Sequence, residues 1–234
     1  MYKKEMNERS PMRVFERSIH GGLGKGNVGV VTSRSGAGKT AFLVGISLDD
    51  LMRERKVLHL NIDNNVEKVR EFYDELFNDL ANSGGLKNKE NVHLSVERHR
   101  LIQTYGRESF SMDKVKAGIA MAKEHMHFEA DTIILDGYPS FSAATEEQVK
   151  ELKDLASEND VELWIAARAK RDDERNEKGI PTKIARFDKH LSVIVHLEPT
   201  GDHIRLDLQK DHENEDVADL FLELDPATLL LKWR

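Results

Sequence analysis

The feature that most constrains the fold is a β-branched apolar segment that runs into a glycine-containing loop and then into a helical pattern. Asn27–Thr32 predicts a buried strand, and Gly38–Met52 predicts a helix with an apolar face. Between them the chain reads Ser33-Arg34-Ser35-Gly36-Ala37-Gly38-Lys39-Thr40. A strand, a loop of this spacing and a helix are the context that a phosphate-binding loop requires. The flanking elements disfavour the alternative, a glycine turn that happens to precede Lys-Thr.

Each residue type in this loop suits a polyphosphate. Gly36 and Gly38 let backbone N–H groups approach an anion closely, and the following helix presents its positive dipole end. Lys39 would neutralise the β- and γ-phosphate oxygens of ATP, and the Thr40 hydroxyl would ligate Mg²⁺, which prefers oxygen. We therefore expect nucleotide binding by Ser33, Arg34, Ser35, Gly36, Ala37, Gly38, Lys39, Thr40 and Ala41. Ser33 stands where the usual pattern has its first glycine.

Strand and helix patterns alternate beyond the loop. Strands are predicted at Val57–Asp63, Asn91–Val96, Thr132–Leu135 and Val161–Ala167, and helices at Val66–Leu80 and Met112–Met126. A further helix is predicted from the capping box Thr145-x-x-Gln148 to about Glu158. Such alternation predicts an α/β fold of three layers, in which a central, mostly parallel sheet is covered by helices on both faces.

The C-terminal quarter has a different pattern. Short strands are predicted in succession at Leu191–Leu197, Ile204–Gln209, Leu220–Leu224 and Leu229–Trp233, which indicates an antiparallel β-meander over residues 191–234. The charged segment around Arg171–Lys178 predicts a mobile loop over residues 171–183. We expect an N-terminal helix and glycine-rich lead-in at residues 1–26, followed by a single domain at 27–234.

Two aspartates follow predicted strands and are candidate catalytic groups beside Lys39. Asp136 ends an apolar strand, where a carboxylate would hold Mg²⁺ through its water shell; the alternative is a turn aspartate in Asp-Gly. Asp63 ends the strand after the loop helix, where it would orient or deprotonate a water molecule. The alternative for Asp63 is an acid stabilised by the dipole of the next helix, and Glu67 would then replace it as the base.

Composition narrows the class of protein. The 234 residues contain no cysteine, which excludes disulfides and thiolate chemistry and fits a reducing cytoplasm. No apolar run approaches the roughly 20 residues that cross a bilayer, and Met1–Arg13 lacks the apolar centre of a signal peptide. A net charge of −7 argues against extensive nucleic-acid binding.

Several weaker signals favour structural roles. His125 and His127 lie at i and i+2, on different faces of a helix, and no third metal ligand is evident. The basic clusters Arg98–Arg100 and Lys170-Arg171 carry no interleaved aromatic residue for base stacking. Trp164 lies in an apolar strand, so we expect it in the core and not against a nucleobase.

The order of these motifs resembles the RecA/DnaB/KaiC-like ATPases, and most closely the uncharacterised bacterial cytoplasmic members. The resemblance covers most of the chain and is strongest from the Gly-Gly-Leu-x-x-Gly segment Gly21–Gly26 through the loop to Asp63. It implies a RecA-like P-loop fold with Asp63 at the position of the catalytic acid and Asp136 as the acid of the central strand. It also implies a homo-oligomer, a ring or a filament, with ATP between subunits.

Members of this family insert a Lys-x-Arg segment into the neighbouring subunit's site, and Lys210-Asp211-His212 matches that segment. Lys210 is retained, but His212 replaces the arginine and would be only partly charged at neutral pH. The resemblance therefore implies slow hydrolysis, or a different basic residue such as Arg205 or Arg171. Arg168 stands near the position of the family's γ-phosphate sensor. The alternative is that Lys210–Asp216 is a solvated turn.

Three functions remain open at this stage. The first is an Mg-ATP-dependent ATPase whose nucleotide state controls oligomerisation or partner binding. The second is a DNA-dependent motor or DNA-binding module, which the acidic net charge and the lack of interleaved aromatics disfavour. The third is a small-molecule kinase, for which Arg168–Arg175 would be the lid and for which the C-terminal meander is unexpected.

Overall fold

A computed structural model describes residues 1–234 and contains one nine-stranded sheet with the order β3-β2-β4-β5-β1-β6-β7-β8-β9. The strands β3, β2, β4, β5, β1 and β6 are parallel, whereas β7, β8 and β9 continue the sheet antiparallel. The strands are β1 (Val28–Ser33), β2 (Val57–Ile62), β3 (Arg100–Tyr105), β4 (Thr132–Asp136), β5 (Glu162–Arg168), β6 (Val193–Thr200), β7 (His203–Asp211), β8 (Leu222–Leu224) and β9 (Leu231–Trp233). The predicted C-terminal meander is confirmed.

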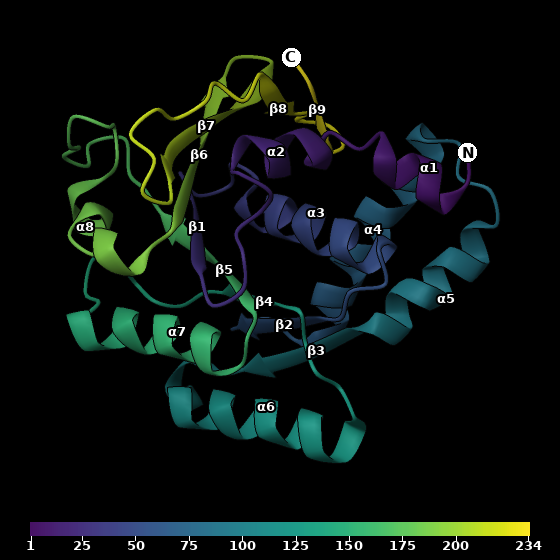
Figure 1. The fold of residues 1–234 in the computed structure, drawn as a ribbon, viewed down its shortest axis with the longest axis horizontal. Helices are drawn as coiled ribbons and strands as arrows, with labels where there is room; N and C mark the ends of the chain where they lie inside the picture. The colour runs from purple at the N-terminus through teal and green to yellow at the C-terminus, as the bar shows by residue number, and fades with distance from the viewer.

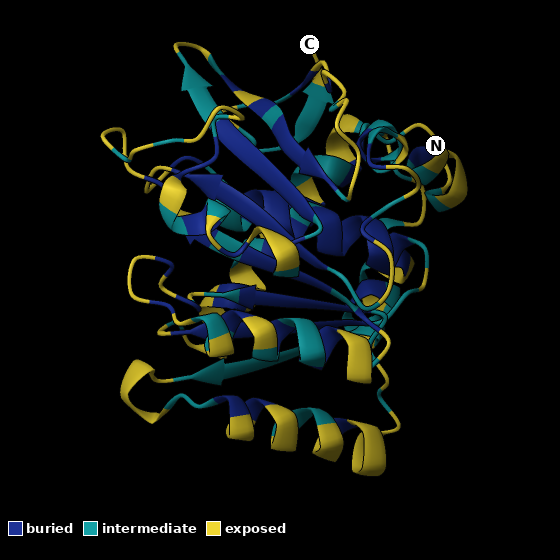
Figure 2. Ribbon diagram, turned by 60° about the vertical axis from the view of Figure 1, so that its left-hand side comes forward, coloured by how far each residue is buried: buried dark blue, intermediate teal, exposed yellow.

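Helices cover both faces of the sheet (Figure 1). The α-helices are α1 (Lys3–Glu8), α2 (Met12–Ser18), α3 (Lys39–Met52), α4 (Val66–Ser83), α5 (Lys89–His99), α6 (Met112–Met126), α7 (Glu146–Glu158) and α8 (Thr182–Ala185). The five helices from α1 through α5 pack on one face of the sheet through a core of 33 buried residues. The helices α6, α7 and α8 pack on the other face through a core of 24. The expected three-layer α/β arrangement is thus present, and the burial colours of Figure 2 show the sheet as its inner layer.

Two local features confirm predictions about the core and about one of the covering helices. Trp164 is 2% exposed and lies over Gly29 of β1, where an added Cβ would come within 2.4 Å of the indole ring. The prediction that Trp164 is a core residue is therefore confirmed. At the start of α7, the Thr145 hydroxyl accepts from the Gln148 backbone N–H, and the Gln148 side chain accepts from the Thr145 N–H. This is the capping box that the sequence predicts.

The predicted strand at Asn91–Val96 is wrong, because these residues belong to α5. Apolar residues alternate there at Val92, Leu94 and Val96, which imitates a strand. However, Leu94 is 49% exposed, while Val92 and Val96, four residues apart, are buried on one helix face. The strand of this region is β3, which begins at Arg100 and has partly exposed residues throughout.

The N-terminal segment forms two helices where one was predicted, and ionic contacts fasten the second to α3. Arg13 of α2 pairs with Asp49 of α3, and Glu16 pairs with Arg53 at 2.9 Å. Burial raises the pKa of Asp49, while Arg13 and Arg53 oppose that rise. Since a buried charge without a partner is costly, this network fixes α2 on the helix that follows the glycine loop.

The segment predicted as a mobile loop is held at several points. Arg175 donates to the Gly179 carbonyl at 2.7 Å, Asp173 pairs with Lys183 at 2.6 Å, and Gln209 of β7 donates to the same Gly179 oxygen at 3.1 Å. Its last residues form α8. The mobility of the remainder stays a prediction.

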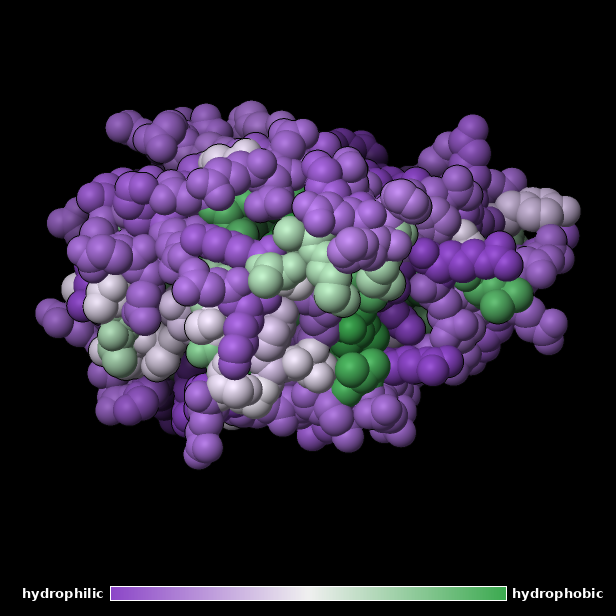
Figure 3. Space-filling view, turned by 90° about the horizontal axis from the view of Figure 1, so that it is seen from below, coloured by the Kyte–Doolittle hydropathy of each residue, from purple (hydrophilic) through white to green (hydrophobic).

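The surface is mostly hydrophilic. Seen from the side of α6, Figure 3 shows a limited hydrophobic area surrounded by polar residues. The chain contains no helix with the length and apolar character needed to cross a bilayer.

Candidate phosphate-binding site

The glycine loop lies between β1 and α3 at the carboxyl end of the parallel strands. Gly36 and Gly38 have φ of 77° and 83°, a region that side chains rarely adopt. A Cβ on Gly36 would meet nothing within 4 Å, so this glycine serves the backbone conformation and leaves the space above it open. A Cβ on Gly38 would meet Leu224 at 3.3 Å and Leu229 at 3.7 Å. The loop is therefore open on one side and supported by the meander on the other.

Lys39 is folded over this loop. Its Nζ donates to the Ser33 carbonyl at 3.2 Å, the Ser33 Oγ at 3.0 Å and the Arg34 carbonyl at 2.9 Å. Burial lowers the pKa of Lys39, the Asp136 carboxylate opposes this effect, and Arg168 adds to it. Ser33, the departure from the glycine pattern, thus supplies a hydroxyl acceptor that holds the lysine within the loop.

Thr40 and Asp136 are joined although the strands behind them are not neighbours. The Thr40 hydroxyl donates to Asp136 Oδ2 at 2.8 Å, and β5 lies between β1 and β4 in the sheet. Burial raises the pKa of Asp136, while the Thr40 hydrogen bond and the Lys39 charge lower it. The structure brings together Lys39, Thr40 and Asp136 from the predicted set.

This donor set suits Mg²⁺ only if other ligands come from elsewhere. A hydroxyl and a carboxylate are hard oxygen donors, and Mg²⁺ commonly keeps several waters and takes the rest from substrate phosphates. The chain has no group of three or more His, Cys, Asp or Glu side chains arranged to hold a metal ion. Thr40 and Asp136 therefore fit Mg²⁺ that arrives with a polyphosphate.

Asp63 has a different environment from the one expected. It follows β2 with φ of 80°, and its carboxylate accepts from the Arg107 backbone N–H at 3.0 Å and from Arg107 Nε at 2.6 Å. Its N–H donates to the Tyr105 carbonyl at 3.0 Å, so Asp63 is bound to the segment after β3. Glu67 is exposed in the first turn of α4. Neither carboxylate contacts Lys39 or Thr40.

A basic hollow of about 390 Å³ adjoins the phosphate loop and was not predicted as a unit. It is lined by Arg34, Arg171, Arg175, Glu198 and Pro199. Ser33 pairs in register with Arg168 of β5 and with Leu197 of β6, so the segments after these two strands flank the loop. Arg34 follows β1, Arg171 and Arg175 follow β5, and Glu198 and Pro199 lie near the end of β6. The sequence could have indicated this group only through the positions of its members near strand ends.

Lys210 and His212 lie toward the opposite end of the sheet. Asp211 pairs with Val193, which also pairs with Gly29 near the start of β1, whereas the loop follows the end of β1. Lys210 Nζ donates to the Asp188 carbonyl at 2.7 Å and pairs with its carboxylate at 2.9 Å.

The His212 ring bonds both to a neighbouring side chain and to the glycine-rich lead-in. Its Nδ1 is 2.7 Å from Asp211 Oδ1, and its Nε2 is 3.0 Å from the Leu23 carbonyl. Within the chain, Lys210 and His212 do not join the loop. Their action on a neighbouring subunit stays a prediction, as do the roles of Arg205, exposed on β7, and of Arg168.

No protein-family model matches this chain, and no curated protein matches it either.

Proposed function

We propose that this chain is a RecA-like ATPase that binds Mg-ATP on Ser33–Ala41 and hydrolyses it slowly. The observation that carries the proposal is the joining of Lys39, Thr40 and Asp136 beside an open glycine loop. Lys39 supplies a positive charge, Thr40 and Asp136 supply hard oxygen ligands, and the N-terminus of α3 supplies the positive end of a helix dipole. Each of these groups favours a triphosphate with its magnesium ion.

Phosphoryl transfer needs positioning and charge compensation more than covalent chemistry. Lys39 and the loop N–H groups would hold the β- and γ-phosphates. Thr40 and Asp136 would orient the magnesium ion, which supplies charge neutralisation when it is bound. Asp63 would position the attacking water after its carboxylate leaves Arg107.

Slow turnover follows from two contacts. Arg107 occupies both oxygens of Asp63, so this carboxylate must exchange partners before it assists a water molecule. Lys210 and His212 are engaged with Asp188, Asp211 and Leu23, so a neighbouring subunit would gain them only after these bonds break. Slow turnover keeps the protein in its ATP-bound state for a long time, and this state would control its assembly or its binding to a partner.

One observation favours a second candidate, the transfer of phosphate to a small acceptor. The hollow lined by Arg34, Arg171 and Arg175 adjoins the loop and carries one carboxylate, from Glu198. Arginine binds phosphate and carboxylate groups through paired N–H donors. An anionic acceptor would therefore be attracted to this position.

The test compares ATP binding and phosphate release in the wild type and in Lys39→Ala. We expect titration calorimetry with Mg-ATP to show binding that Lys39→Ala abolishes, because the main phosphate cation is removed. Lys123→Ala, at an exposed site on α6, is the matched control and should bind normally. Unchanged affinity in Lys39→Ala would refute the site. ADP formation that requires an added acceptor and is not accompanied by free phosphate would favour the second candidate.

A further inference from the structure

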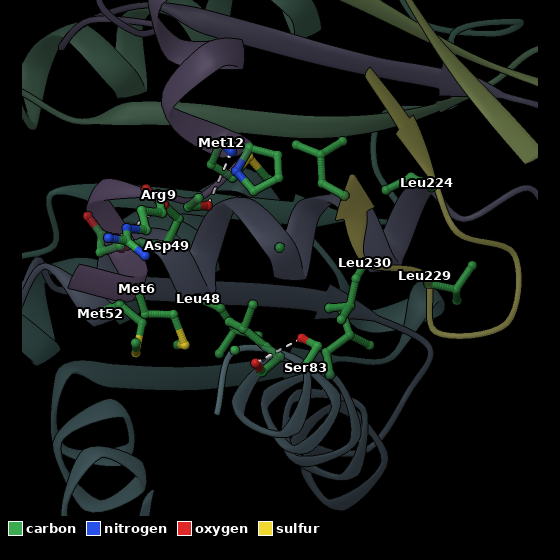
Figure 4. A pocket seen from close by; sticks show the side chains of 18 of the residues that line it. Met6, Arg9, Met12, Leu48, Asp49, Met52, Ser83, Leu224, Leu229 and Leu230 are labelled. Carbon is green, nitrogen blue, oxygen red and sulfur yellow. Dashed lines mark hydrogen bonds between the residues drawn. The ribbon is translucent and has the colours of Figure 1, made fainter. Parts of the chain in front are cut away.

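A second cavity, of about 220 Å³, lies apart from the hollow beside the phosphate loop. It is enclosed by the N-terminal helices, the α3 helix, the end of α4 and the turn between β8 and β9. Of its 21 lining residues, 13 are hydrophobic, so its interior favours an apolar occupant. Figure 4 shows the side chains of Met6 from α1, of Leu48 and Met52 from α3, and of Leu230 from the turn between β8 and β9 around it.

One end of the cavity is polar and carries an unpaired cation. Arg9 lines this end and is exposed, and its guanidinium makes no hydrogen bond or ion pair within the chain. Figure 4 shows Arg9 and Asp49 at the same end, opposite Leu229. The Asp49 carboxylate is already paired with Arg13 and with Arg53. The free charge at this end is therefore the positive charge of Arg9.

We propose that this cavity binds a monocarboxylate with an apolar tail of medium length. The tail lies among Leu48, Met52 and Leu230, and the carboxylate accepts hydrogen bonds from Arg9, whose planar group suits a carboxylate. A cavity of about 150 Å³ already admits benzene, so 220 Å³ holds a longer chain. A carboxylate gains charge-assisted hydrogen bonds from Arg9 that an alcohol or a hydrocarbon does not, which is why the observations favour an acid.

The proposal does not rest on ATP binding, because the residues that would hold the acid, Arg9, Leu48, Met52 and Leu230, lie outside Ser33–Ala41 and are not Asp136. It commits to a small molecule and not to a second copy of the chain. The reason is the shape of the site: its apolar lining is contributed by four segments around one cavity, and its charged group lies at one end. A protein surface would instead need a broad apolar face.

The experiment titrates the full-length protein with octanoate, below the concentration at which it forms micelles, and with 1-octanol. Calorimetry should show one octanoate per chain and weaker binding of 1-octanol. Arg9→Gln should weaken octanoate binding on the order of tenfold, the loss expected for a charge-assisted hydrogen bond, and leave 1-octanol unchanged. Arg17→Gln, on an exposed position of α2 outside the cavity, is the matched control.

Ser83→Trp provides the steric test. Ser83 is exposed in the last turn of α4 and lines the cavity, so a tryptophan there can cover the cavity without entering the core. It should abolish binding of both probes while circular dichroism stays unchanged. Equal affinities for octanoate and 1-octanol, or an unchanged octanoate affinity in Arg9→Gln, would overturn the proposal. So would absence of octanoate binding together with a wild-type dimer that Ser83→Trp dissociates, which would assign the cavity to a second copy.

Discussion

Arg107 holds both carboxylate oxygens of Asp63, one through its backbone N–H at 3.0 Å and the other through Nε at 2.6 Å. If Asp63 is the group that positions water, Arg107→Gln removes the guanidinium from Oδ2, keeps the backbone N–H on Oδ1, and should raise ATP turnover several-fold without changing ATP affinity. Steady-state phosphate release and calorimetry would measure the two quantities separately. Turnover that stays at the wild-type value would mean that this ion pair does not limit hydrolysis.

Asp63→Asn tests the same carboxylate directly. Asparagine tolerates the left-handed backbone that Asp63 adopts, so the fold should be kept. We expect unchanged ATP binding and a fall in turnover of about 100-fold or more, the lower end of the range for loss of a general base. Wild-type turnover in Asp63→Asn would move that role to another group, with Glu67→Gln as the next variant to measure.

The basic hollow makes a separate prediction. Replacing both Arg171 and Arg175 by alanine should weaken ATP binding or slow turnover by about tenfold or more, because two cations beside the loop are lost. Lys170→Ala, at the adjacent exposed position outside the hollow, should have little effect. Mixing the double variant with Lys39→Ala adds a second readout. Recovery of activity in the mixture would show that the arginines act on a neighbouring subunit and not on their own loop.

His212→Arg distinguishes the predicted role between subunits from the contacts seen within one chain. The ring of His212 bonds Asp211 and the Leu23 carbonyl, and arginine at a residue with φ of 51° would lose this geometry. We expect a loss of stability of about 1–3 kcal/mol and no gain in turnover. Urea unfolding and phosphate release would measure both, and faster hydrolysis would instead support action on a neighbour's γ-phosphate.

The lowered pKa of the buried His59 imidazole should make the stability of the fold depend on pH. Burial, with a smaller contribution from the Arg100 charge, lowers the pKa of His59 from 6.5 to about 3. Between these values the unfolded chain binds a proton that the folded chain does not, so the unfolding free energy falls as pH drops below 6.5. The slope from this residue is about 1.4 kcal/mol per pH unit. His59→Phe should flatten the stability profile between pH 6.5 and pH 4, and an equally steep profile would contradict the assignment.

The elements that the sequence predicted well are those whose signal is local. The glycine loop, the amphipathic α4 and the capping box at Thr145 each depend on neighbouring residues, and each is found close to its expected bounds. The prediction of a strand over Val92, Leu94 and Val96 was wrong, because six residues with alternating apolar side chains can form a strand or one face of a helix. Only the burial of the side chains distinguishes the two. Tertiary packing on α3 then selected the helix.

In the candidate site too, the residues with a local sequence signal were predictable and those placed by strand pairing were not. Lys39, Thr40 and Asp136 were predictable because each follows or begins an element with a clear pattern. The partner of Asp63 was not predictable, since Arg107 lies 44 positions away and is brought there only by the pairing of β2 with β3. The hollow of Arg34, Arg171 and Arg175 also depends on strand order, which no local pattern encodes.

Leu224 and Leu229 contact the position of Gly38 on one side and line the apolar cavity on the other. The last part of the chain thus forms the back wall of the loop that begins near its start. A change in the packing of Leu224 and Leu229 against Gly38 would change how freely the backbone N–H groups of the loop can adjust to an anion. A mutation or a small molecule near the C-terminus would then alter the proposed phosphate site without contacting Lys39, Thr40 or Asp136.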